Sequence, residues 1–176
     1  MMKQLRFISD ERGSILVETA LVLPILVLIF VGMVEFSEAF MVKRKAGAVA
    51  SATADLVAQA SRVSAADLAD ISSIANNLMQ PYPAGPLIVL VECVTADANG
   101  NPLVTWSWSS PASAAKPKAG DPYPLPDGLI GANESIIVTQ TSYTFTPPIA
   151  QFLTDGVQFN STAYFKPRLS PTVQLQ

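Results

Sequence analysis

One ionisable side chain lies inside the most apolar stretch of the chain. Between Ile15 and Val34 the only acidic or basic residue is Glu18. A carboxylate at the centre of a membrane-spanning helix costs about 2.5–3.5 kcal/mol on insertion scales. The cost falls near the start of a helix, where hydration and the helix dipole both favour a negative charge. Glu18 is therefore the first candidate for a functional residue. Gly13 and Ser14, at the junction between a short charged leader and the apolar stretch, are the next.

The rest of the sequence offers little of the chemistry that enzymes use. The chain contains no histidine and one cysteine, Cys93. A zinc site of ordinary ligands and a Ser-His or Cys-His nucleophile are thereby excluded. The acidic residues are scattered, and Asp67 and Asp70 lie in the first turns of a predicted helix, where helix-end electrostatics explains them better than a catalytic or metal dyad. We therefore expect no enzymatic activity, no cofactor and no metal site.

Charge and cysteine content narrow the class of partner. The formal net charge is −3, and the 11 Lys and Arg residues are dispersed along the 176-residue chain. Nucleic-acid binding needs a clustered basic surface, so we do not expect it. A single cysteine cannot form an internal disulfide, and an extracytoplasmic domain of this chain must be stabilised by packing.

The apolar stretch that contains Glu18 is long enough to cross a membrane. About 20 residues at roughly 1.5 Å each match a hydrocarbon core of about 30 Å. A secretory signal peptide has a shorter apolar region and a small-residue cleavage site after it, whereas Glu35, Phe36, Ser37 and Glu38 follow here. Residues 14–35 are therefore predicted to form a transmembrane helix, and Pro24 is expected to kink or loosen it.

Residues 36–80 are predicted to be helical and to lie outside the membrane. The first part has apolar and small residues near helical spacing, which we interpret as a packing stripe for a neighbouring helix or sheet: Phe36, Phe40, Ala46, Ala50, Ala54 and Ala58. High helix propensity is an equally good reason for the alanines. After a break near Arg62, Ser64 and Asp67 have the spacing of a capping box and predict a second helix from about Ala65 to Met79.

Residues 81–176 are predicted to form an antiparallel sheet of about four strands. Residues 87–96 and 103–110 read as a hairpin turning at Asn99-Gly100, and 134–146 and 157–168 as two further strands. Val104, Trp106 and Trp108 should share one face. Residues 110–131 form a Pro-rich surface loop and 149–156 a short helical turn. The fold class is α+β: a long N-terminal helix, a short helix and a small sheet.

The segment RGSILVETALVLPILVLIFVGMVEFSEAF resembles the N-terminus of the TadE/TadG-like family of tight-adherence (Tad) pilus assembly proteins, which are type IV pilin-like. The similar features are R-G before the helix, V-E-T-A-L, an L-P pair and a V-E-F exit. The resemblance implies that residues 1–13 are a leader that a prepilin peptidase removes after Gly13. The mature chain would begin at Ser14, and Glu18 would lie beside the N-terminal amine of a neighbouring subunit.

The same resemblance implies a function and a place in the cell. Lys and Arg residues on the two flanks of the apolar segment give no net bias, so the orientation comes from the family: N-terminus in the cytoplasm, C-terminal domain in the periplasm, single pass through the bacterial inner membrane. The chain would be a minor pilin or pseudopilin of a Tad-type pilus. Its partners would be other pilin-like subunits, the prepilin peptidase, the inner-membrane assembly platform and membrane lipid. The alternative is an unprocessed, membrane-anchored periplasmic module that binds envelope glycan or a protein.

Overall fold

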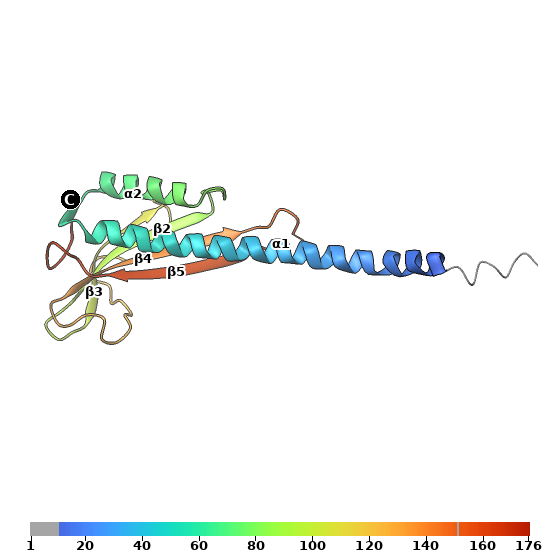
Figure 1. The fold of residues 1–176 in the computed structure, drawn as a ribbon. Coiled ribbons are helices and arrows are strands. Elements are labelled where there is room, and N and C mark those ends of the chain that lie inside the picture. Colours follow the sequence, from blue (N-terminus) through green and yellow to red (C-terminus); the bar gives the residue numbers. More distant parts are fainter. Residues whose placement is uncertain (1–10, 151) are drawn as a thin grey trace, which may run out of the picture.

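The computed structural model describes residues 11–150 and 152–176; residues 1–10, most of the predicted leader, lie outside this range. Helix α1 (Glu11–Ala58) is 48 residues long and continues through Pro24. At about 1.5 Å per residue it spans roughly 72 Å. Figure 1 shows its N-terminal part extending away from a compact unit formed by the other elements, so the predicted α+β architecture with a long N-terminal helix is confirmed.

The second helix begins as the sequence predicts. Helix α2 (Ala65–Leu78) has Ser64 as its N-cap, and the Ser64 side chain and the Asp67 side chain each bond the other residue's backbone N–H. The Asp67 carboxylate accepts the Ser64 N–H at 2.8 Å, and this bond lowers the pKa of Asp67 below its usual value. The predicted capping box is therefore confirmed, with Asp in the place where Glu or Gln is more common.

Four antiparallel strands form the main sheet, in the order β3-β2-β4-β5. Their bounds are Leu87–Ala96 for β2, Pro102–Ser110 for β3, Ser135–Phe145 for β4 and Val157–Phe165 for β5. A second, parallel pair joins β1 (Arg62–Val63) to β6 (Gln174–Leu175). This pair was not predicted, because two-residue strands have no readable period and their partners are more than a hundred positions apart.

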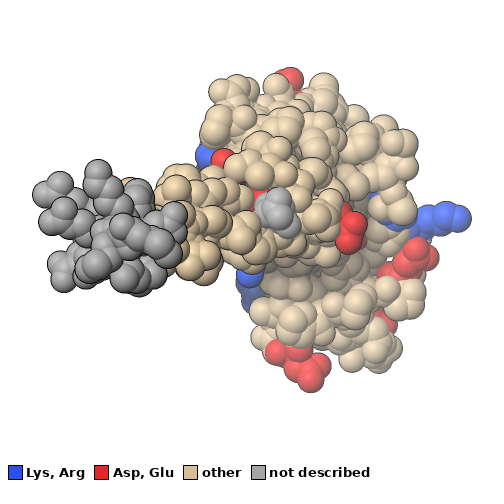
Figure 2. Space-filling model, turned by 90° about the vertical axis from the view of Figure 1, so that its right-hand side faces the viewer, with Lys and Arg blue, Asp and Glu red and all other residues tan. Residues whose placement is uncertain are grey.

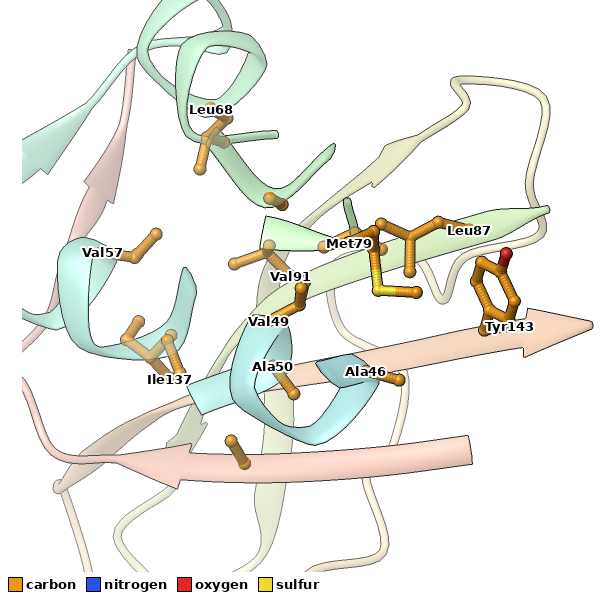
Figure 3. Packing of buried hydrophobic residues seen from close by; sticks show 14 of the residues in the cluster. Ala46, Val49, Ala50, Val57, Leu68, Met79, Leu87, Val91, Ile137 and Tyr143 are labelled. Atoms are coloured by element: carbon orange, nitrogen blue, oxygen red, sulfur yellow. The ribbon is translucent and has the colours of Figure 1, made fainter. Parts of the chain in front are cut away.

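Both helices cover one face of the main sheet. Helix α1 packs on β5 and β4, and α2 lies against α1 and β3. The core between the layers combines small side chains from α1 with larger ones from α2 and the strands, as Figure 3 shows for Ala46, Ala50, Leu68, Val91 and Ile137. On the end of the molecule drawn in Figure 2, Lys and Arg side chains lie at separate places and form no single patch.

The other face of the sheet is covered by the Pro-rich loop. Val94, Ile136 and Val138 form a second cluster, and Tyr123, Leu125, Leu129 and Ile130 from the loop pack on it. The Tyr123 N–H also donates to the Pro102 carbonyl at 3.0 Å along the outer edge of β3. The segment predicted as a surface loop is thus a loop that closes a core and protects a sheet edge.

Three local predictions are wrong. In β3, Trp106 pairs with Cys93 but Val104 pairs with Val94, so Thr105 is an extra residue in a β-bulge. The bulge reverses the alternation and turns Val104 away from the face of Trp106 and Trp108. In the hairpin, positive φ occurs at Gly100 (85°) and not at Asn99.

The hairpin loop is longer than a two-residue turn because the Asp97 carboxylate organises it. This carboxylate accepts the N–H groups of Asn99 and Asn101, each at 2.8 Å.

The third correction concerns the predicted helical turn after β4. Residues 149, 150 and 152–156 form bends and a turn with no helix. The backbone N–H groups of Phe152 and Leu153 donate to the Glu35 carboxylate of α1.

Candidate functional site

The predicted processing site lies at the exposed end of α1. Gly13 and Ser14 are in its first turn and are solvent-exposed. A Cβ atom placed on Gly13 would meet no atom within 4 Å. The backbone at this position is therefore open to an approaching molecule, and the fold places no steric demand on the residue type.

Glu18 is also exposed, about one turn further along α1. Its neighbour Thr19 satisfies its own hydroxyl by donating to the Ile15 carbonyl at 2.8 Å. Within residues 11–150 and 152–176, no hydrogen bond or ion pair to the Glu18 side chain is found. The carboxylate is thus available for a contact outside this chain.

The residues around Glu18 form a continuous apolar surface. All side chains from 13 to 30 are exposed. Among the described residues one helix, Gly13–Ala58, is long and apolar enough to cross a membrane. A helix that is apolar on every side and uncovered by its own protein needs lipid or other helices around it. This half of α1 fits a single-pass membrane anchor.

The boundary between the exposed and buried halves of α1 is marked by a buried carboxylate. Glu35 is 1% exposed and accepts the backbone N–H groups of Phe152 and Leu153, at 3.0 and 3.2 Å. One turn earlier, Gly32 lies under the Phe152 ring, where an added Cβ would be 3.2 Å from the ring edge. The connection between β4 and β5 is therefore fastened to the helix at this level.

Sequence reasoning missed the role of Glu35. It was read as part of the charged exit from the membrane. A signal was present, because Glu35 is in register with Ala39, Val42 and Ala46, which are all buried on one side of the helix. A carboxylate in such a row must find donors or remain uncharged.

The predicted packing stripe is divided by the structure. Ala46, Ala50, Ala54 and Ala58 are buried, whereas Phe36 and Phe40 are exposed. The alanines let the chain's own sheet approach closely, and Thr141 of β4 donates its hydroxyl hydrogen to the Ala46 carbonyl at 3.0 Å. The two phenylalanines instead line an open apolar groove with Ile25, Leu28, Ile29, Gly32, Met33, Ser37 and Phe152.

A second buried carboxylate lies on the loop-covered side of the sheet. Glu92 accepts a hydrogen bond from the Gln140 amide at 3.3 Å, and the same amide donates to the Tyr123 hydroxyl at 2.7 Å. Burial raises the pKa of Glu92, and the hydrogen bonds from Tyr123 and Gln140 offset only part of this. The three residues connect β2, β4 and the loop, which makes this a structural network.

The described residues offer little else for catalysis or metal binding. Cys93 is buried beside the Thr172 hydroxyl, 3.4 Å away, and burial raises the pKa of its thiol. Over the same residues, no group of three or more Cys, Asp and Glu side chains is placed to hold a metal ion. The candidate functional residues that the sequence predicts, Gly13, Ser14 and Glu18, all lie on α1.

Comparison with known proteins agrees with this location. Residues 13–55 match the family described as TadE-like protein. Searches of curated proteins and of solved structures returned no match. The matched residues begin at Gly13, include Glu18 and Glu35, and end near the last turn of α1, so the family resemblance is confirmed for the helix and not for the sheet. Over residues 13–55 this chain is therefore similar to the TadE-like family, and the similarity suggests a protein associated with the Tad pilus.

Proposed function

We propose that this protein is a minor pilin or pseudopilin that acts structurally in priming, assembly or tip formation of a Tad-type pilus. One observation carries the proposal: a single continuous helix has an exposed apolar first half and a second half buried against a small antiparallel sheet. The TadE-like match spans both halves. Such a subunit can be held by the bilayer through one half of the helix and present a folded domain on the other.

Processing after Gly13 is the first part of the proposal. The first four N–H groups of an α-helix have no intrahelical acceptor. Because α1 begins at Glu11, the Gly13 N–H is one of them. Unwinding the Gly13–Ser14 bond for a peptidase would therefore break few hydrogen bonds, and both residues are already exposed.

The second part is a contact made by Glu18. A carboxylate among lipid tails is costly without a partner, and the described residues of this chain provide none. Cleavage after Gly13 would create an amine at Ser14, four residues before Glu18. In a bundle of such helices, the amine of one subunit can neutralise Glu18 of the next. The remaining partners are the prepilin peptidase and the inner-membrane assembly platform, with the sheet domain in the periplasm.

N-terminal sequencing of the protein purified from cells with a Tad system tests the processing step. The expected first residue is Ser14. Gly13→Val should accumulate with an intact N-terminus, and because the added atoms meet nothing in the fold, failure to process would reflect recognition and not misfolding. Ala20→Val, also at an exposed position of the same helix half, is the matched control and should be processed normally.

A wild-type chain that begins at Met1 or Met2 would overturn the processing proposal. It would favour a permanently anchored periplasmic module that binds envelope glycan or a protein.

Glu18→Ala and Glu18→Gln test the subunit contact. Both variants should be processed at Ser14 and fold normally, because Glu18 makes no contact with the sheet domain. Both should lose recovery with sheared pili or with the assembly complex, since neither can pair with an amine. Glu38→Ala, which removes a carboxylate from α1 outside the apolar stretch, is the control. Normal recovery of both Glu18 variants would contradict the pairing role.

A further inference from the structure

We propose that the connection between β4 and β5 is a second membrane contact, in which Ile149 and Phe152 insert into the lipid interface beside the end of the transmembrane part of α1. The inference rests on α1 crossing the bilayer and does not depend on a role in a pilus. The proposed partner is the lipid surface on the side of the sheet domain.

The first argument is depth. Gly32 lies 17 residues after Ile15, which at about 1.5 Å per residue is roughly 26 Å along the helix. A hydrocarbon core is about 30 Å thick. Gly32 is therefore near the far edge of the core, and the Phe152 ring lies directly over it. A side chain at this level is beside lipid tails or at their boundary with the headgroups.

The second argument is that hydrogen bonds to Glu35, here called the Glu35 clasp, hold the loop in place. The Glu35 carboxylate accepts the N–H groups of Phe152 and Leu153, so these two backbone donors are already hydrogen-bonded where the loop would meet the membrane. Unsatisfied backbone groups are what normally exclude loops from the lipid boundary. Ala150 has a positive φ of 51°, which for a non-glycine residue marks a backbone held by its surroundings. The loop is thus built for one position on the helix.

The third argument is the character of its surface. Ile149 is 56% exposed and Phe152 48% exposed, and no charged residue occurs between Ser135 and Thr154. In Figure 1 the connection reaches beyond the sheet along α1 toward the N-terminus. Figure 2, which views that end of the molecule, shows mainly uncharged atoms with isolated acidic side chains among them. Aromatic and aliphatic side chains in this position are typical of an interfacial anchor.

Continuity with the helix favours lipid over a second copy as the occupant. Phe152 lines the same open groove as Ile25, Ile29 and Met33, which belong to the apolar part of α1. The loop therefore extends the surface that lipid already covers. Its effect would be to fix the tilt of the sheet domain over the bilayer, because two contacts define an orientation that a single helix leaves free.

Site-directed spin labelling of the full chain in phosphatidylethanolamine–phosphatidylglycerol vesicles tests the proposal. A label at Ile149→Cys is compared with labels at Met33→Cys and Leu169→Cys. Met33 is an exposed position of the helix near the core edge, and Leu169 is an apolar side chain with 72% exposure near the opposite end of the domain. Cys93 is buried and has a raised thiol pKa, so the introduced thiols react selectively.

Collision rates with oxygen and with nickel ethylenediaminediacetate report the depth of each label. At residue 149 oxygen should dominate, as at residue 33, whereas the nickel complex should dominate at residue 169. Adding Phe152→Asp should shift the label at 149 toward the aqueous value. Glu35→Ala should do the same by releasing the loop, and Glu35→Gln, which keeps one acceptor oxygen, should shift it less.

Two outcomes would overturn the proposal. One is a label at 149 that behaves like the label at 169. The other is low collision rates with both reagents together with spin–spin broadening that disappears on dilution with unlabelled chain, because this would show a second copy on the loop. If the label at 33 is itself aqueous, the membrane anchor fails and the loop contact fails with it; normal processing and pilus incorporation would remain separate questions.

Discussion

The two halves of α1 are one continuous helix with opposite surroundings. Residues 13–30 are exposed on every side, and their side chains are mostly Leu, Ile and Val. From Gly32 onward one side is buried, and its side chains are mostly Ala and Val. Apolar character alone therefore does not make a core here. What separates the halves is size, because a sheet can approach the helix closely only where the facing side chains are small.

The exposed half of α1 and the folded unit also differ in whether their carboxylates have hydrogen-bond partners. In the exposed half Glu18 has no partner among the described residues of its own chain, whereas Glu35 accepts two backbone N–H groups and Glu92, in the sheet, is bonded by Gln140. In the folded unit, the buried carboxylates of Glu35 and Glu92 both accept hydrogen bonds from N–H donors. The exposed half leaves this requirement to whatever surrounds the helix.

Enlarging a buried alanine should have the largest effect. Ala50→Leu adds three carbon atoms at a position that is 1% exposed and should lower the free energy of unfolding by about 1–3 kcal/mol. Ala48→Leu, two residues away at an exposed position, should change it by less than about 0.5 kcal/mol. Urea unfolding in detergent, followed by tryptophan fluorescence, measures both. Equal midpoints would show that the sheet does not pack on α1 as described.

A pH titration sharpens the comparison of the carboxylates. Because the pKa of Glu92 is raised in the folded state from about 4.5, the folded chain binds the proton more tightly than the unfolded chain. Stability from this residue is fully present below the unfolded pKa and is lost as the pH rises through the folded pKa. Tyr123 stays neutral in this range, since burial raises its own pKa.

Glu92→Gln should remove that part of the pH dependence. As the pH rises above about 4.5, the urea midpoint of the variant should become progressively higher than that of the wild type. Glu134→Gln is a suitable control, because the pKa of this exposed carboxylate is lowered by the Gly131 N–H and by Lys166, which gives the opposite sign. A flat difference for Glu92→Gln would indicate that Glu92 titrates normally.

Truncation in the exposed half should have the smallest effect on the fold. Val27→Ala should leave the free energy of unfolding of the sheet domain within about 0.5 kcal/mol of wild type, because Val27 is 52% exposed and does not belong to its core. The same change at buried Val49 removes two methyl groups and should lower the free energy of unfolding by about 0.8 kcal/mol for each of them. A similar loss at both positions would mean that the halves are not energetically separate.

Local chemistry explains which parts of the fold were predictable. The start of α2 follows from Ser64 and Asp67, which meet within one turn. Strand β2 follows from a run of β-branched and apolar residues that only Glu92 interrupts. The end of β5, predicted at residue 168, lies at Phe165, because a strand ends where its partner ends. The bulge at Thr105 and the β1–β6 pair could not be predicted, since both depend on how distant segments align.

The candidate site likewise contains residues that could be identified from the sequence and one that could not. Gly13, Ser14 and Glu18 were identified because their meaning depends on spacing along a single helix. The clasp at Glu35 was missed because its partners, Phe152 and Leu153, are more than a hundred residues away. The register of Glu35 with the buried side of α1 signals that its carboxylate is buried, but no local pattern reports which distant residues bond it.

The sequence alone determined the long apolar helix, the short capped helix, the four strands of the main sheet and the position of the one acid in the apolar segment, because periodicity, capping and transfer cost are properties of neighbouring residues. Tertiary structure decided which side of α1 is buried, that the Pro-rich loop closes a second core, and that Glu35 fixes the β4–β5 connection at the end of the exposed apolar half of α1. These features arise only when layers pack, since close packing and the need to satisfy buried polar groups act between residues that the chain order keeps apart.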